Sequence, residues 1–127
     1  MTKYINEHAR RWLDALRSGD YKQGKGRLCV VLPDEEPCFC TLGVAADLFV
    51  PKEHQHDNHG VRYFEGGSAG LSREVADKIG LQSILGAAAG HQLPAIFELN
   101  DTDHWSFTQI ADHLEHHSSA YFVPVTA

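Results

Sequence analysis

The chain has 127 residues, of which 43% are hydrophobic and 22% are charged, and its formal net charge is −6. This length and composition are typical of a soluble globular protein, so we expect residues 1–127 to form a single domain whose core needs no metal or disulfide. The net charge argues against general nucleic-acid binding, which depends on clustered lysine and arginine, and no apolar run in the chain is long enough to span a membrane.

The cysteines and the first residues point to a reducing compartment. The chain contains three cysteines, which is an odd number, and they lie in one short segment as Cys29, Cys38 and Cys40. This is a poor framework for disulfides. The N-terminal residues lack the apolar segment of a secretion signal. We therefore expect a cytoplasmic protein with reduced thiols, and no motif predicts a cofactor.

The first half of the chain predicts two helices around a short strand. Ala9, Trp12, Leu13 and Leu16 repeat with helical spacing, which predicts an amphipathic helix over about residues 5–17. A basic, glycine-containing turn with Lys22, Lys25 and Arg27 follows, and an apolar run predicts a strand over 28–32. A helix is expected from about residue 41 to 49, ending before a proline.

The second half opens with a polar segment. Residues 51–60 are rich in histidine and are predicted to form an exposed loop, followed by a second strand over 61–64. Ser72 can cap a helix that runs to Ile79, with Gly80 just beyond it.

The remaining elements are two helices and an edge strand. Pro94 suits the first turn of a short helix through Leu99. The Ser106-x-x-Gln109 pattern is a capping box that opens the next helix, and 121–125 is predicted to be a terminal edge strand. Together the elements predict a compact, helix-rich α+β domain with a small, mainly antiparallel sheet.

Two cysteines precede the helix predicted to begin at Thr41. A thiol at a helix N-terminus meets unpaired backbone N–H groups and the positive end of the helix dipole, which lower its pKa. Cys40 is therefore a candidate nucleophile. The alternative is that Cys38 and Cys40 are ordinary buried residues, because free cysteine is among the most buried residue types.

Five blocks in chain order resemble a family of small proteins without an established activity that tailed phages and prophages encode. The blocks are W-L-x-A-L-R-S-G-x-Y-K-Q-G from Trp12, F-C-x-L-G-V from Phe39, L-x-x-E-V from Leu71, L-N-D from Leu99 and S-F-x-x-I-A-D from Ser106. The resemblance implies a small intracellular accessory protein. The paired cysteines common in that family are split here, because Thr41 follows Cys40.

Four polar residues in these blocks stand at the ends of predicted elements, where binding sites are often built. We expect Gln23, Cys40, Asn100 and Asp101 to surround one cleft. With the basic turn, they predict a pocket for an anionic, nucleotide-like small molecule, and by analogy with phage counter-defence this ligand would be a sequestered signalling nucleotide. The predicted ligand-binding residues are Tyr21, Lys22, Gln23, Lys25, Thr41, Asn100 and Asp101.

Two alternative functions remain open. A papain-like hydrolase would use Cys40 as nucleophile and Gln23 at the oxyanion. Its base would come from His59, His91 and His104, and Asn100 or Asp101 would orient that base. An acidic protein could instead inhibit a host defence factor through an exposed face.

The histidines of 54–59 and 113–117 do not follow known zinc spacings, so no metal site is predicted. Asn100 and Asp101 can also be a simple turn.

Overall fold

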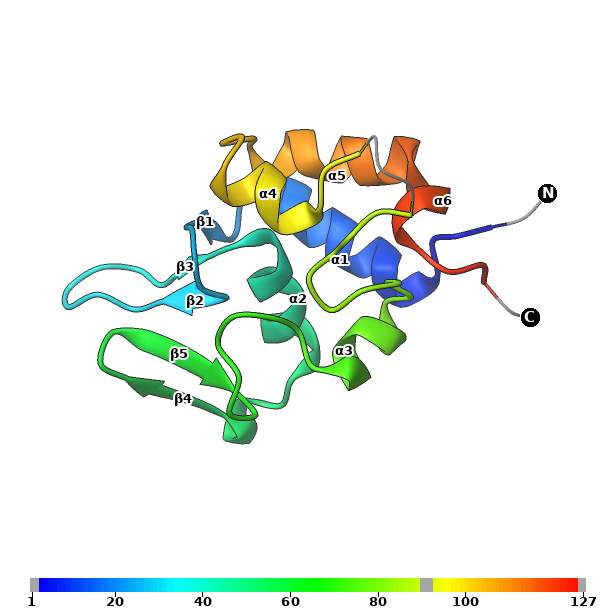
Figure 1. The fold of residues 1–127 in the computed structure, drawn as a ribbon. Coiled ribbons are helices and arrows are strands. Elements are labelled where there is room, and N and C mark those ends of the chain that lie inside the picture. Colours follow the sequence, from blue (N-terminus) through cyan, green and yellow to red (C-terminus); the bar gives the residue numbers. More distant parts are fainter. Residues whose placement is uncertain (1–2, 90–92, 126–127) are drawn as a thin grey trace.

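The computed structural model describes residues 3–89 and 93–125, and Figure 1 shows their arrangement. The helices are α1 (Glu7–Ser18), α2 (Thr41–Phe49), α3 (Arg73–Lys78), α4 (Ile96–Asp101), α5 (Phe107–His116) and α6 (Ser118–Tyr121), with a 3-10 turn η1 (Lys52–His54). The strands are β1 (Lys22–Gln23), β2 (Cys29–Val30), β3 (Cys38–Phe39), β4 (Gln55–Asn58) and β5 (Val61–Phe64). This α+β architecture confirms the predicted fold class.

The strands form one sheet in the order β1-β3-β2-β5-β4. β1 pairs with β3 in parallel, and the other neighbours are antiparallel. In Figure 1 the sheet lies to one side of the helices, and the β4–β5 hairpin projects away from them. In the described part of the chain, no helix has the length and apolar character that a bilayer crossing needs.

Helix ends follow the local sequence. The Asn6 side chain accepts a hydrogen bond from Ala9 N and caps α1, which ends at Gly19 with a φ of 82°. This left-handed conformation favours glycine. Ser106 and Gln109 form the predicted capping box of α5. These signals act within a few residues, which is why the sequence located the start of α5 correctly.

The core lies between α1, α2 and α5. The buried side chains of these helices include Trp12, Leu16, Leu42, Phe107, Ile110 and Leu114, and Leu48 packs against the core while remaining half-buried. The Trp12 indole donates to the Thr41 carbonyl at 3.0 Å, so the largest buried side chain also has its polar atom satisfied. This contact fixes the start of α2 against α1.

Two predicted elements are wrong, and a third is displaced by two residues. Residues 51–60 are not a loop, because η1 and β4 form there and β4 pairs along its length with β5. Residues 121–125 are not an edge strand, because Tyr121 ends α6 and Phe122 makes a single bridge with Leu81. The helix expected from Pro94 begins at Ile96. Its last turn therefore contains Asn100 and Asp101, and they are not a separate turn.

Candidate functional site

Five of the seven predicted ligand-binding residues line one of two cavities, and Thr41 and Asp101 line neither. Tyr21 and Lys22 line the main cavity, a hollow of about 780 Å³ between α1, α2, β1, β3 and the β4–β5 hairpin. Gln23, Lys25 and Asn100 line the amide cavity, which measures about 300 Å³ and is completed by Gly24, His104 and Trp105. The chain passes from one hollow to the other within β1, where the side chains of Lys22 and Gln23 point to opposite faces of the strand.

Asn100 is the centre of a buried hydrogen-bond network beside the amide cavity. Its Oδ1 accepts from Gln23 Nε2 at 2.9 Å, from Thr41 N at 3.2 Å and from Thr41 Oγ1 at 3.0 Å. Its Nδ2 donates to Gly24 O and to Asp101 Oδ1, each at 2.8 Å. The side chain is 1% exposed. Both the oxygen and the nitrogen of the side-chain amide therefore have partners within the protein, and the network joins β1, α2 and α4.

The expected common cleft holds only in part. Gln23 and Asn100 line the amide cavity, whereas Cys40, Thr41 and Asp101 are not among its lining residues. Thr41 is fully buried, and Cys40 is 8% exposed. Two of the four residues thus meet at one hollow. Asp101 is joined to them by its hydrogen bond with Asn100 Nδ2, whereas no hydrogen bond among the described residues joins Cys40 to this group.

The Cys40 thiol is not activated. Its Sγ caps α2 by accepting from Gly43 N at 3.3 Å, but burial outweighs this bond and raises the pKa of Cys40 to about 11. The expected lowering of this pKa is wrong, because the helix N-terminus here is desolvated. Within residues 3–89 and 93–125, no imidazole hydrogen-bonds to Cys40.

The three candidate bases do not complete a catalytic pair. His59 lies in the β4–β5 turn with a φ of 51°, and the side chain of His104 contacts Lys25. His91 lies outside the described residues. The structure therefore offers no thiolate and imidazole in contact in the part of the chain that it describes.

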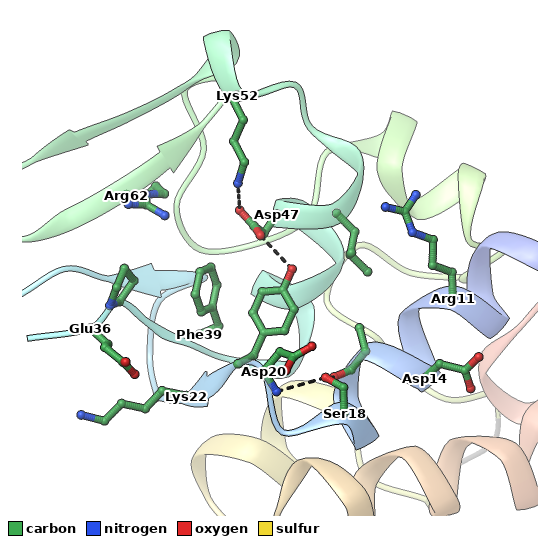
Figure 2. A pocket seen from close by; sticks show the side chains of 14 residues that line it. Arg11, Asp14, Ser18, Asp20, Lys22, Glu36, Phe39, Asp47, Lys52 and Arg62 are labelled. Carbon is green, nitrogen blue, oxygen red and sulfur yellow. Dashed lines mark hydrogen bonds and ion pairs between the residues drawn. The ribbon is translucent and has the colours of Figure 1, made fainter.

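The main cavity contains an aromatic pair and a chain of polar contacts through Asp47 that ends at the exposed Lys52. The rings of Tyr21 and Phe39 meet edge to face, with centroids 5.0 Å apart. Figure 2 shows the Lys52 ammonium directed at Asp47, to which it donates at 2.6 Å. The Tyr21 hydroxyl donates to the other oxygen of Asp47 at 2.8 Å. Burial, together with the Asp47 carboxylate, raises the pKa of Tyr21. Tyr21 therefore stays neutral, and its hydroxyl donates a hydrogen bond to the Asp47 carboxylate.

Charged side chains of both signs surround these rings. The cations lining the main cavity are Arg11, Lys22, Lys52 and Arg62, and the carboxylates are Asp14, Asp20, Glu36 and Asp47. In Figure 2, Arg62 and Lys22 lie on the side of Phe39, and Arg11 lies on the opposite side. The sequence did not predict Asp47, Lys52 or Arg62 as site residues, because they come from separate elements and belong to no local motif.

A third hollow, the hairpin cavity, adjoins the main cavity. It measures about 310 Å³ and is lined by Lys52, Gln55, His56, Asp57 and Arg62. Arg62 donates from Nε and Nη2 to the two Asp57 oxygens at 2.7 Å and 3.2 Å, and these bonds lower the pKa of Asp57. The described residues contain no group of three or more His, Cys, Asp and Glu side chains arranged to hold a metal.

The chain belongs to the family described as Domain of unknown function (DUF8296), whose sequence model matches residues 1–118. No curated protein and no solved structure matches the chain. The family description assigns no activity, so the function has to be argued from the cavities themselves.

Proposed function

We propose that this member of the DUF8296 family binds a small anionic, nucleotide-like molecule in the main cavity. The observation that carries the proposal is the aromatic pair of Tyr21 and Phe39 at a hollow of about 780 Å³. This volume is typical of sites for small organic ligands. A planar base can pack against such rings while charged groups at the rim bind its phosphate.

All four cations keep donors for an anion, and Arg11 forms no ion pair or side-chain hydrogen bond with any residue that the structure describes. Lys22 makes no ion pair or side-chain hydrogen bond among the described residues. Lys52 donates to Asp47, which leaves two of its three N–H groups. Arg62 uses Nε and Nη2 for Asp57, so Nη1 remains. A phosphate can therefore bind without breaking the ion pairs that hold Lys52 and Arg62 in place.

The carboxylates at the rim suit the rest of a nucleotide. Asp14 and Glu36 form no ion pair within residues 3–89 and 93–125, and Asp20 uses only its backbone N–H in a bond with Ser18 Oγ. Carboxylate oxygens accept from sugar hydroxyls and from base amino groups. A ligand with one anionic end and several hydroxyl or amino donors matches this distribution better than a simple polyanion does.

Binding without turnover fits the Cys40 thiol better than hydrolysis does. A pKa of about 11 leaves the thiol protonated at neutral pH, and a protonated thiol is a poor nucleophile. The phage-like blocks then suggest a role in the host cytosol, namely sequestration of a signalling nucleotide during counter-defence. This role rests on analogy with the family resemblance.

The test is isothermal titration calorimetry with AMP, ADP, cyclic di-AMP and ADP-ribose as probes. Lys22→Ala removes a donor from the main cavity and is expected to weaken binding roughly tenfold, because a charge-assisted hydrogen bond contributes about 1.5–3 kcal/mol and this one is partly screened. Lys25→Ala is the matched control, since Lys25 is the same residue type three positions away and lines the amide cavity.

The two variants separate the possible results. Weaker binding by Lys22→Ala alone supports the main cavity. Weaker binding by Lys25→Ala alone would move the site to the amide cavity. If none of the four probes binds, the proposed function is wrong.

A further inference from the structure

Asp47 holds two other residues of the main cavity in place. Its Oδ2 accepts a hydrogen bond from the Tyr21 hydroxyl at 2.8 Å, and its Oδ1 accepts one from Lys52 Nζ at 2.6 Å. The three residues come from different parts of the chain, because Asp47 lies in α2, Lys52 begins η1 and Tyr21 precedes β1. All three line the main cavity. Asp47 therefore connects the aromatic pair to one of the cations that we propose to bind phosphate.

Among the carboxylates that line the main cavity, Asp47 is the one held in position. Its side chain is 12% exposed, and both of its oxygens accept hydrogen bonds. Asp14, Asp20 and Glu36 are exposed, and their carboxylates have no side-chain partner among the residues that the structure describes. A fixed side chain loses less conformational freedom on binding than an exposed one does. Asp47 is thus the carboxylate best prepared to bind one specific group of a ligand.

The pair formed by Tyr21 and Asp47 offers only acceptors to a ligand. A carboxylate that pairs with a lysine has no proton to donate, so the Tyr21 hydroxyl uses its single proton for Asp47. The hydroxyl oxygen then retains only lone pairs. Each Asp47 oxygen accepts one of the two bonds and can accept another. A ligand group that contacts this pair must therefore be a donor.

Lys52 places these acceptors beside the phosphate. The ammonium group that donates to Asp47 retains two N–H groups for an anion, so a phosphate bound by Lys52 lies next to Asp47. Direct contact between the phosphate and the carboxylate is unfavourable, because both are negative. The ligand must therefore offer Asp47 a donor that is close to its own phosphate. The ribose hydroxyls of a nucleotide meet this requirement, whereas an amino group of the base lies on the edge remote from the sugar.

We infer that Asp47 binds a ribose hydroxyl of the ligand and makes the main cavity selective for ribonucleotides over deoxyribonucleotides. This inference rests on the proposed function, because it assumes a nucleotide whose phosphate is bound by Lys52. The aromatic pair and the cations impose no such preference, since a deoxynucleotide carries the same base and the same phosphate. A deoxynucleotide that occupies the cavity leaves the fixed acceptors without their donor, which lowers its affinity.

Analogues that each lack one donor test the inference. Titration calorimetry compares AMP and ADP with their 2′-deoxy forms, their 3′-deoxy forms and the forms without the 6-amino group of the base. For the nucleotide that binds more tightly, at least one deoxy form is expected to bind roughly tenfold more weakly, because it loses a charge-assisted hydrogen bond. The form without the amino group keeps both hydroxyls and is expected to bind as the parent nucleotide does.

Asp47→Asn assigns the preference to the carboxylate. Asparagine has the same shape but presents an NH₂ group in place of one oxygen, so the ratio of ribo to deoxy affinity is expected to fall severalfold. Removing a negative charge beside the phosphate changes both affinities alike and leaves the ratio unaffected. Asp77→Asn is the matched control, because Asp77 is a helical aspartate that pairs with Arg73 at 3.0 Å and lines none of the three cavities. Unfolding temperatures show whether both variants are folded.

Two results would overturn the inference and leave the proposed function standing. One is equal affinity of the native protein for the parent nucleotide and both deoxy forms, which needs no variant. The other is an Asp47→Asn protein that binds all nucleotides more weakly but keeps the native ratio, as expected if Asp47 only supports the fold. A lack of binding by AMP and ADP would also overturn the inference, and if cyclic di-AMP and ADP-ribose fail as well, the proposed function is wrong too.

Discussion

Asn100 is predicted to stabilise the fold, and this role can be separated from ligand binding. Asn100→Ala removes the acceptor of Thr41 N, a backbone donor in a residue that is 0% exposed at the first turn of α2. A buried donor without a partner costs about 1–3 kcal/mol. The half-buried Gly24 carbonyl also loses its donor, and a typical lost bond costs about 1 kcal/mol. We therefore expect the free energy of unfolding to fall by roughly 2–4 kcal/mol.

The loss is large compared with the stability of a small domain, which is about 5–15 kcal/mol, so urea titration followed by circular dichroism will resolve it. Asn58→Ala is the control, since Asn58 is an exposed residue of β4 and its replacement should change the stability by less than about 0.5 kcal/mol. A change below about 1 kcal/mol in Asn100→Ala would refute the reasoning.

Asn100→Asp tests the direction of the hydrogen bonds. The substitution keeps the acceptor for Thr41 but places an oxygen where Nδ2 now lies 2.8 Å from Gly24 O and from Asp101 Oδ1. Facing oxygens repel one another, and a buried carboxylate is costly. We expect this variant to be less stable than the native protein at pH 7 and to recover part of the loss in acid, where the carboxyl group regains a proton that it can donate.

Three further predictions concern other parts of the fold. Gly43→Ala should destabilise the protein by more than about 2 kcal/mol in urea titration, because a Cβ there would lie 1.7 Å from the Leu28 carbonyl oxygen; a native-like midpoint would show that the contact can relax. In native protein, iodoacetamide should label the half-buried Cys38 well before Cys40, since burial raises the pKa of Cys40 to about 11; equal labelling rates would contradict this. Burial, followed by the neighbouring imidazoles, lowers the pKa of His113 below 6.5, so the folded state disfavours its protonation. Stability present above about pH 6.5 should be lost as the pH falls, and His113→Gln should make the free energy of unfolding less dependent on pH between about 7 and 5.

Local signals predicted the helices well and the strands less well. The caps at Ser72 and Ser106 lie where the sequence placed them, because a side chain that bonds the backbone three residues later needs no distant partner. β4 was missed because its residues are polar and, apart from Gln55, exposed. Its pairing with β5 depends on the turn at His59 and Gly60, both with positive φ, and not on an apolar pattern.

The chemistry of the candidate site depended still more on tertiary contacts. The sequence alone identified Tyr21, Lys22, Gln23 and Asn100 as polar residues of interest. It could not show that the amide oxygen and the amide nitrogen of Asn100 both have hydrogen-bond partners inside the fold. The direction in which the pKa of Cys40 shifts could not be predicted from the local sequence either, because the position at the helix N-terminus lowers the pKa and burial raises it. Burial is a property of the whole fold.

The sequence by itself therefore determined the α+β fold class and the apolar faces of the helices, and it supplied some of the residues on which the proposed binding site is based. Only the tertiary structure decided which of these residues meet. It brought Lys52 and Arg62 together from η1 and β5 at the junction of two cavities, and it separated Lys22 from its neighbour Gln23. The physical reason is that caps and periodicity act over a few residues, whereas cavities arise where elements distant in the chain fail to fill the space between them.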